Sequence, residues 1–152
     1  MQRIYVEGVP RLVLAEAERW DPGFANGLGN LDNAIEHVVI VPTELHFHPE
    51  RLRHWESVME NVCLKLPDEP EEERILAGCL HWTFLRHVLP TSPQVAILHD
   101  YLNQHGLMKL AEDFASQFLA VLASNEEMFG VVCKFFPQYP RHRVGFDYLN
   151  RH

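Results

Sequence analysis

The sequence has no long apolar run. No stretch approaches the roughly 20 consecutive apolar residues that a membrane-spanning helix needs. Met1–Glu7 has no basic start followed by an apolar segment, so we expect no signal peptide. The three cysteines, Cys63, Cys79 and Cys133, include no CxxC pair and fall within apolar helical stretches. We therefore interpret them as small buried side chains of a cytoplasmic protein.

Basic residues are also few. The chain has 13 Lys and Arg against 21 Asp and Glu, a formal net charge of −8. Its first fifty residues carry eight acids and three bases, and only residues 134–152 are basic. Because binding to nucleic acid needs a basic stripe that neutralises phosphates, this distribution argues against a nucleic-acid partner. An acidic body suits a basic protein partner, and it also keeps a protein dispersed in solution.

Known catalytic signatures are missing as well. The sequence contains no G-x-S-x-G elbow, phosphate-binding loop, dinucleotide fingerprint or HExxH motif. Repeats, low-complexity tracts and long linkers are absent too. A length of 152 residues with 47% apolar residues suits one hydrophobic core. We therefore predict a single domain over 1–152, with a strand- and loop-rich part at 1–48, a helical body at 49–136 and an aromatic, basic tail at 137–152.

From Pro49 onward, apolar residues recur at the three- and four-residue spacing of helices. Local signals mark the ends: Ser92 before Pro93, Gly106 as a left-handed terminus, and Ser124 with Glu127 at capping-box spacing. Asp68 is the expected cap of the second helix. The predicted helices are Pro49–Leu66, Pro70–Leu89, Pro93–Gln104, Leu107–Ala123 and Ser124–Phe136. The predicted core comprises Trp55, Met59, Val62, Leu80, Leu110, Phe114 and Phe118.

The first third of the chain reads differently. Alternation over Arg3–Glu7 predicts a short strand, and the run at Ile35–Val41 predicts a buried strand ended by Pro42. Val9–Trp20 favours a helix, although Leu12–Ala15 would also suit a strand. Three glycines and a proline predict a loop over Asp21–Asn33. The expected fold is mostly α (α+β), with a small N-terminal strand element packed on a bundle of about four to five helices.

Ten histidines are the one unusual feature of the composition, and their densest group could hold a metal. His46 and His48 are two apart on an expected extended segment, so they point to one side. Glu50 and His54 are four apart on the predicted helix and share a face. Carboxylate and imidazole ligands suit Zn²⁺, Fe²⁺ or Mn²⁺. In the alternative interpretation, His48 caps the helix and the other histidines are exposed or satisfied by neighbours.

Arg74 and His81 are the second candidate pair. Their spacing resembles that of HEPN-type ribonucleases, helical domains that cleave RNA at a dimer interface, although Ile75 stands where that family usually has a polar residue. The resemblance implies that His81 acts as acid or base and that Arg74 stabilises phosphate charge. Alternatively, both lie on a solvated face, and Trp82 and Arg86 form a cation–π pair.

The C-terminal tail combines aromatic rings with arginines, residue types that are enriched at interface centres. Its apolar residues are too many to remain exposed to water without a surface to pack on. We expect it to pack on an acidic helical surface of the same chain or across the axis of a two-fold homodimer. The expected interface residues are Phe136, Tyr139, Arg141, Arg143, Phe146 and Tyr148.

These features favour a non-enzymatic regulatory, inhibitory or accessory protein that acts by binding another protein. No cofactor is expected for that function. The alternative is a small enzyme that uses a divalent transition metal at His46, His48, Glu50 and His54. The more remote alternative is a HEPN-like ribonuclease that uses Arg74 and His81.

Overall fold

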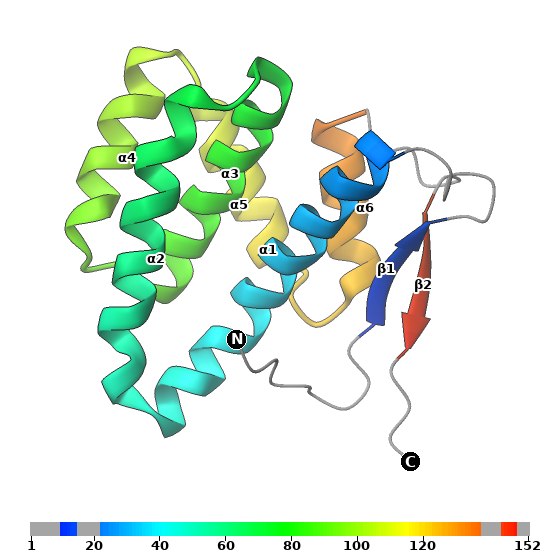
Figure 1. The fold of residues 1–152 in the computed structure, drawn as a ribbon, viewed down its shortest axis with the longest axis horizontal. Helices are drawn as coiled ribbons and strands as arrows, with labels where there is room; N and C mark the ends of the chain where they lie inside the picture. The colour runs from blue at the N-terminus through cyan, green and yellow to red at the C-terminus, as the bar shows by residue number, and fades with distance from the viewer. Residues whose placement is uncertain (1–9, 15–21, 138–143, 149–152) are drawn as a thin grey trace. The chain divides into compact units, whose positions relative to one another are not determined.

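The computed structural model describes residues 10–14, 22–137 and 144–148, with side chains described from residue 31 to residue 137. Within these residues the chain forms six α-helices, two short strands and two 3₁₀ turns (Figure 1). In chain order they are β1 (Pro10–Leu14), α1 (Pro22–Phe47), η2 (Pro49–Arg51), α2 (Leu52–Lys65), η3 (Leu66–Asp68), α3 (Glu71–Val88), α4 (Pro93–Gln104), α5 (Met108–Leu119), α6 (Asn125–Phe135) and β2 (Val144–Tyr148). The predicted helical bundle is confirmed.

The chain divides into two compact units, one formed by Met1–Ile40 with Val121–His152 and the other by Val41–Ala120. In the first unit β1 and β2 pair antiparallel, with Pro10 opposite Tyr148 and Leu14 opposite Val144. The helix favoured for Val9–Trp20 is therefore wrong at β1, where the strand alternative holds. The strand predicted at Arg3–Glu7 lies outside the described residues, and a strand element packed on the bundle stays a prediction.

Helix α1 replaces two predicted elements, the loop at Asp21–Asn33 and the strand at Ile35–Val41. Leu31, Ile35 and Val38 are buried at a spacing of four and three residues, which is the helical period. This spacing outweighs both the glycines, which cost about 1 kcal/mol each in a helix, and the β-branched run that indicated a strand.

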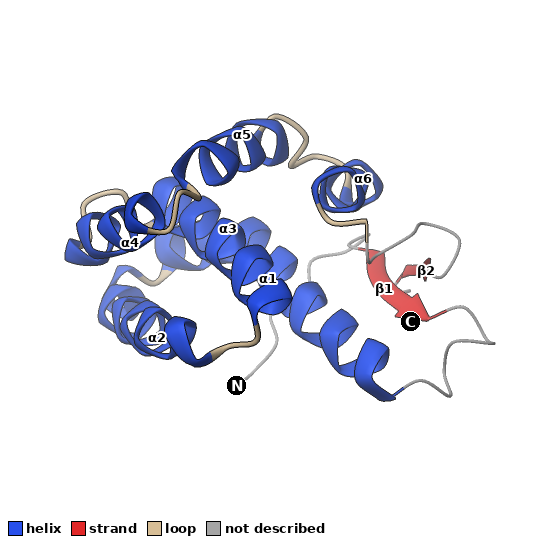
Figure 2. Cartoon of the chain, turned by 90° about the horizontal axis from the view of Figure 1, so that it is seen from above, coloured by secondary structure: helices blue, strands red, loops and turns tan. Residues whose placement is uncertain are grey.

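The second unit is built around α3, which packs mainly against α5 and also against α2 and α4 (Figure 2). Gly78 allows the close approach of α4, because a Cβ atom added there would lie 3.2 Å from a methyl group of Leu102. Predicted and observed helices agree here, except that 3₁₀ turns take over the ends of Pro49–Leu66 and that α5 stops at Leu119.

Most predicted helix ends are confirmed. The Ser92 hydroxyl accepts from the Gln94 N–H at 3.2 Å, the Ser124 hydroxyl accepts from the Glu127 N–H at 3.2 Å, and Gly106 has φ +68°. Asp68 was wrongly predicted as a cap. It lies in η3, and α3 begins after Pro70 without a side-chain cap.

The predicted core is largely confirmed in the second unit. Trp55, Met59, Leu80, Phe114 and Phe118 are buried, and the last two rings stack with centroids 5.5 Å apart. The other two predicted core residues, Val62 and Leu110, are only half-buried, because they lie at the margins of their helices' buried faces. No helix in the described part of the chain combines the length and apolarity needed to cross a membrane.

Candidate functional site

The candidate site is the turn between α1 and α2, and we call residues 46–53 the α1–α2 corner. Helix α1 ends at Phe47, and η2 turns the chain directly into α2. Two backbone bonds fix the turn. The N–H of His48 donates to the carbonyl of Glu44 at 2.7 Å, and the N–H of Arg51 donates to the carbonyl of His48 at 3.0 Å.

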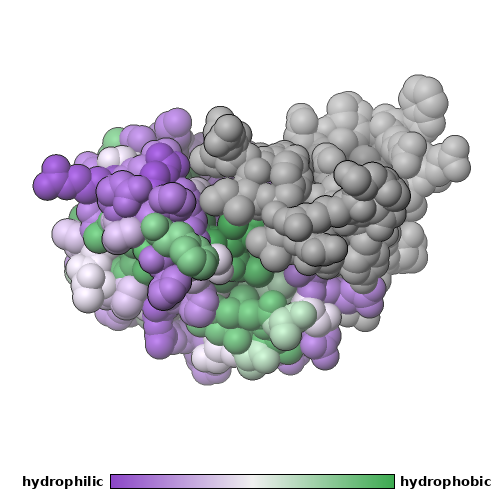
Figure 3. Space-filling model, turned by 90° about the horizontal axis from the view of Figure 1, so that it is seen from below, coloured by the Kyte–Doolittle hydropathy of each residue, from purple (hydrophilic) through white to green (hydrophobic). Residues whose placement is uncertain are grey.

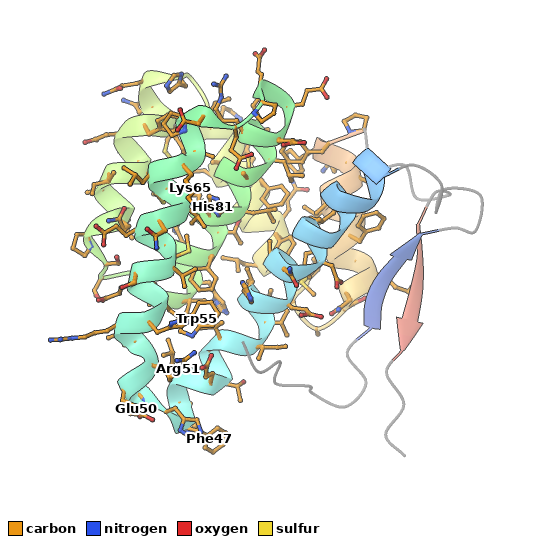
Figure 4. All side chains as sticks on the ribbon, in the orientation of Figure 1. Phe47, Glu50, Arg51, Trp55, Lys65 and His81 are labelled. Atoms are coloured by element: carbon orange, nitrogen blue, oxygen red, sulfur yellow. The ribbon has the colours of Figure 1, made fainter. Side chains whose placement is uncertain are left out.

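A carboxylate ties the two helices together behind this turn. The Glu44 side chain on α1 accepts from Nε of Arg51 at 2.8 Å and from Nε1 of Trp55 at 2.9 Å (Figure 4). The indole is buried, and its ring lies 6.0 Å from that of Phe84 on α3. Glu44, Arg51 and Trp55, which we call the corner clasp, therefore fix α2 against both α1 and α3.

The electrostatics of the corner clasp favour the ionised carboxylate. Burial of Glu44, whose side chain is 10% exposed, works against ionisation. Hydrogen bonds from Arg51 and Trp55, together with electrostatic interactions with Arg51 and His54, outweigh burial and hold the pKa of Glu44 below its usual value. A charged, hydrogen-bonded and largely enclosed carboxylate makes a rigid joint.

Apolar side chains project into solvent from the corner. Phe47 is 70% exposed and Leu52 is 42% exposed. The Phe47 ring is in a T-shaped arrangement with the neighbouring His46 ring, with centroids 5.1 Å apart. Figure 3 views the molecule from the end where α1 meets α2 and shows apolar residues exposed among hydrophilic ones. The corner thus presents apolar side chains on a rigid support.

The predicted metal ligands all lie at or beside this corner, but they do not converge. Nδ1 of His48 lies 3.3 Å from a Glu50 oxygen, and both side chains are exposed. His46 is at the end of α1, whereas His54 is half-buried on α2 with its Nε2 enclosed and without a hydrogen-bond partner. Among the described residues, no three His, Cys, Asp or Glu side chains are placed to hold one metal ion. The metal site stays a prediction without support from the geometry.

Arg74 and His81 both lie on α3, seven residues and therefore about 10 Å apart along its axis. His81 keeps part of its surface in solvent, but burial of its imidazole lowers the pKa of the side chain to about 4. The imidazole is therefore neutral at pH 7. Arg74 is also half-buried, so the fully solvated face that was the alternative interpretation does not describe this pair.

A second carboxylate cluster joins α3 to α5. Glu112 accepts from Nε1 of Trp82 at 3.2 Å and pairs with Arg86. The Arg86 guanidinium lies 5.9 Å from the centre of the Trp82 ring, which confirms the predicted cation–π pair. We call Glu112, Trp82 and Arg86 the α3–α5 clasp. Its chemistry matches that of the corner clasp, but Glu112 is 39% exposed.

Two of the three cysteines, Cys63 and Cys79, do not offer a nucleophile at neutral pH. Burial raises the pKa of Cys63 to about 11 and that of Cys79 to about 12, so both thiols stay protonated. Cys79 is buried as predicted, whereas Cys63 and Cys133 are half-buried.

The predicted tail interface is only partly within the described residues. Phe136 is 5% exposed at the end of α6, so its ring packs inside the protein. Phe146 and Tyr148 belong to β2, which pairs with β1. Tyr139, Arg141 and Arg143 lie outside the described residues. The tail interface and the two-fold dimer stay predictions.

The residues that organise the corner were not predicted from the sequence. Glu44 lies three residues after Val41 on the line of buried residues along α1, and an acid on an apolar stripe signals a carboxylate with buried partners.

The chain matches no protein-family model, no curated protein sequence and no solved structure.

Proposed function

We propose that this is a non-enzymatic regulatory, inhibitory or accessory protein of the cytoplasm, and that it binds another protein through the α1–α2 corner. The observation that carries the proposal is the 70% exposed Phe47 ring on a turn that the corner clasp holds rigid. An aromatic anchor that is already fixed in place loses little conformational freedom on binding, which favours affinity.

The neighbours of Phe47 suit the same function. Leu52 extends the apolar surface, and Arg53 is exposed beside it without a described partner. Aromatic residues and arginines are enriched at protein interfaces. His46, His48 and Glu50, first considered as metal ligands, are exposed polar residues of the same corner, and an apolar centre with polar residues around it is usual for an interface.

Site-specific photo-crosslinking in the cells that make the protein tests this proposal. A photoreactive phenylalanine derivative replaces Phe47 at the corner, and in a matched variant it replaces Ile97, which is 55% exposed on α4. We expect one discrete crosslinked product from position 47 and none of that mass from position 97. Excess unlabelled wild-type protein should suppress the product, because it competes for the same partner.

A competitor that carries Phe47→Ser and Leu52→Ser should fail to suppress the product. Both side chains are exposed, so the doubly substituted protein should fold as the wild type does, which circular dichroism checks. Identical products from positions 47 and 97, or equal competition by the wild-type and substituted proteins, would remove the corner as the binding surface.

A further inference from the structure

The chain passes between its two compact units at two places. The first crossing lies within α1, because residues up to Ile40 belong to the first unit and residues from Val41 belong to the second. The second crossing is the turn between α5 and α6, where Ala120 ends the second unit and Val121 returns the chain to the first. Any motion of one unit against the other must therefore be taken up at these two crossings.

A proline marks the crossing in α1. Pro42 lies inside this helix, two residues after Ile40, the last residue of the first unit at this crossing. A proline has no N–H to donate to the carbonyl of Val38, and its ring collides with that carbonyl in a straight helix, at a cost of about 3 kcal/mol. Sharp bends in helices are mostly found at such prolines. The backbone of α1 is therefore held less firmly at this point than in an uninterrupted helix.

The residues around Pro42 also favour other conformations. Residues 38–41 are all valine or isoleucine, and Thr43 follows the proline. Such β-branched side chains lose rotamer freedom in a helix, which lowers their helix propensity. The same run gave rise to the strand predicted at Ile35–Val41. Intrinsic preference therefore does little to keep the backbone of residues 38–43 in one helical conformation.

The end of α1 is anchored immediately after this weak stretch. Glu44 comes two residues after Pro42, and its carboxylate accepts from Arg51 and Trp55 in the corner clasp. The last turn of α1 is therefore fixed to α2 within the second unit. A bend at Pro42 would move the first unit and leave the α1–α2 corner in place.

The second crossing is a short turn without helix. Helix α5 ends at Leu119 and α6 begins at Asn125. Within the turn, the N–H of Ser124 donates to the carbonyl of Val121 at 3.1 Å. Turns and the ends of helices are where proteins absorb the changes in φ and ψ that a hinge requires. Both crossings between the units therefore have the local structure of hinge points.

We propose that Pro42 and the turn at residues 120–124 form a hinge, and that the first unit turns about the line that joins them. Two crossing points define one axis, so rotation about it needs backbone changes at these two places only. The hinge goes beyond the proposed function, because the corner clasp lies wholly within the second unit. The α1–α2 corner therefore keeps its shape in every position of the first unit.

Double electron–electron resonance between spin labels on the full chain tests the hinge. The labels are attached to an introduced ketone-bearing amino acid, which leaves the native cysteines in place. One pair spans the units, at Asn33 on α1 and Ser57 on α2. Two control pairs each stay within one unit, Asn33 with Glu127 and Ser57 with Ile97, and all four positions are exposed. We expect the distances between the units to spread at least about twofold more widely than those of either control pair. An equally narrow spread would overturn the proposal.

Substitution of the proline makes the test specific. Pro42→Ala supplies the missing N–H and removes the ring, so the spread between the units should narrow toward that of the control pairs. Pro67→Ala, in η3 of the second unit, is the matched control and should keep the wild-type spread. A Gly-Gly insertion after Ala123, which keeps Ser124 as the cap of α6, should widen it further.

Two results would exclude Pro42 as a hinge point. One is an unchanged spread between the units in a Pro42→Ala protein that circular dichroism shows to be folded. The other is an equal narrowing in the Pro42→Ala and Pro67→Ala proteins, which would show that loss of any proline has this effect. Neither result bears on binding at the α1–α2 corner, which crosslinking from position 47 tests separately.

Discussion

The two clasps of the second unit use the same three residue types in different surroundings. At the corner, Glu44 on α1 receives the indole N–H of Trp55 and the guanidinium of Arg51. Between α3 and α5, Glu112 receives those of Trp82 and Arg86. In both, the tryptophan and arginine are four residues apart, and the carboxylate comes from another helix.

The two clasps differ in how far their carboxylates are exposed to solvent. The Glu44 side chain is 10% exposed and the Glu112 side chain is 39% exposed. Water screens the pairing at Glu112 and can replace its partners, whereas a buried carboxylate that loses its partners stays unsatisfied. We infer that the corner clasp holds its helices in place, whereas α3 and α5 depend on apolar packing.

The largest expected effect tests whether apolar packing holds α5 against α3. Phe114 lies two residues after Glu112 on α5, is fully buried and stacks on Phe118. Phe114→Ala should lower the free energy of unfolding by about 3–5 kcal/mol, because it leaves a cavity between α5 and its neighbours. Urea unfolding measures the change. A loss below about 1 kcal/mol would contradict the claim that apolar packing holds α5 in place.

Acid titration separates the contribution of His81 from that of the corner clasp. The folded state holds the pKa of His81 at about 4, below its ordinary value of 6.5, so the unfolded chain binds the proton more readily. Stability should therefore be complete above pH 6.5 and fall by up to about 3 kcal/mol as the pH drops toward 4.

Glu44 contributes to the pH dependence of stability at lower pH than His81 does. Its pKa is lowered, so its contribution is present above the ordinary value of 4.5 and is lost only as the pH falls through the folded value. Urea unfolding between pH 7.5 and pH 3 should show two steps. His81→Gln should flatten the upper step alone, and an unchanged upper step in that variant would exclude His81 as its source.

The smallest expected effects come from the two carboxylates compared directly. Glu44→Gln keeps the shape, but it removes the charge that pairs with Arg51 and one of the two oxygens that accept from Arg51 and Trp55, and it should cost about 1–3 kcal/mol. Glu112→Gln should cost less than about 1 kcal/mol, because its pairing is screened by solvent. Both values come from urea unfolding at pH 7. Equal losses would show that exposure does not distinguish the clasps.

The sequence predicted what depends on local spacing. Helices α2 to α5 follow from apolar periodicity, and the ends at Ser92, Gly106 and Ser124 follow from residue types with a known local conformation. Helix α1 was not predicted because its glycines and its valine run indicate other structures, and packing overrides both.

The candidate site was harder to predict because its contacts are not local. The partners of Glu44 are seven and eleven residues away across a turn, so no helical or strand spacing links them. The exposure of Phe47 and Leu52 depends on how each helix is rotated in the packed unit, which sequence spacing leaves open.

The measurement closest to the central claim combines the clasp with binding. Photo-crosslinking from position 47 in the Glu44→Gln and Glu112→Gln proteins, both folded and at the same concentration, asks whether the buried joint presents the corner to its partner. We predict that Glu44→Gln gives much less of the crosslinked product than the otherwise unsubstituted protein, whereas Glu112→Gln gives as much. An undiminished product from a folded Glu44→Gln protein would contradict the claim that the corner clasp organises the binding surface.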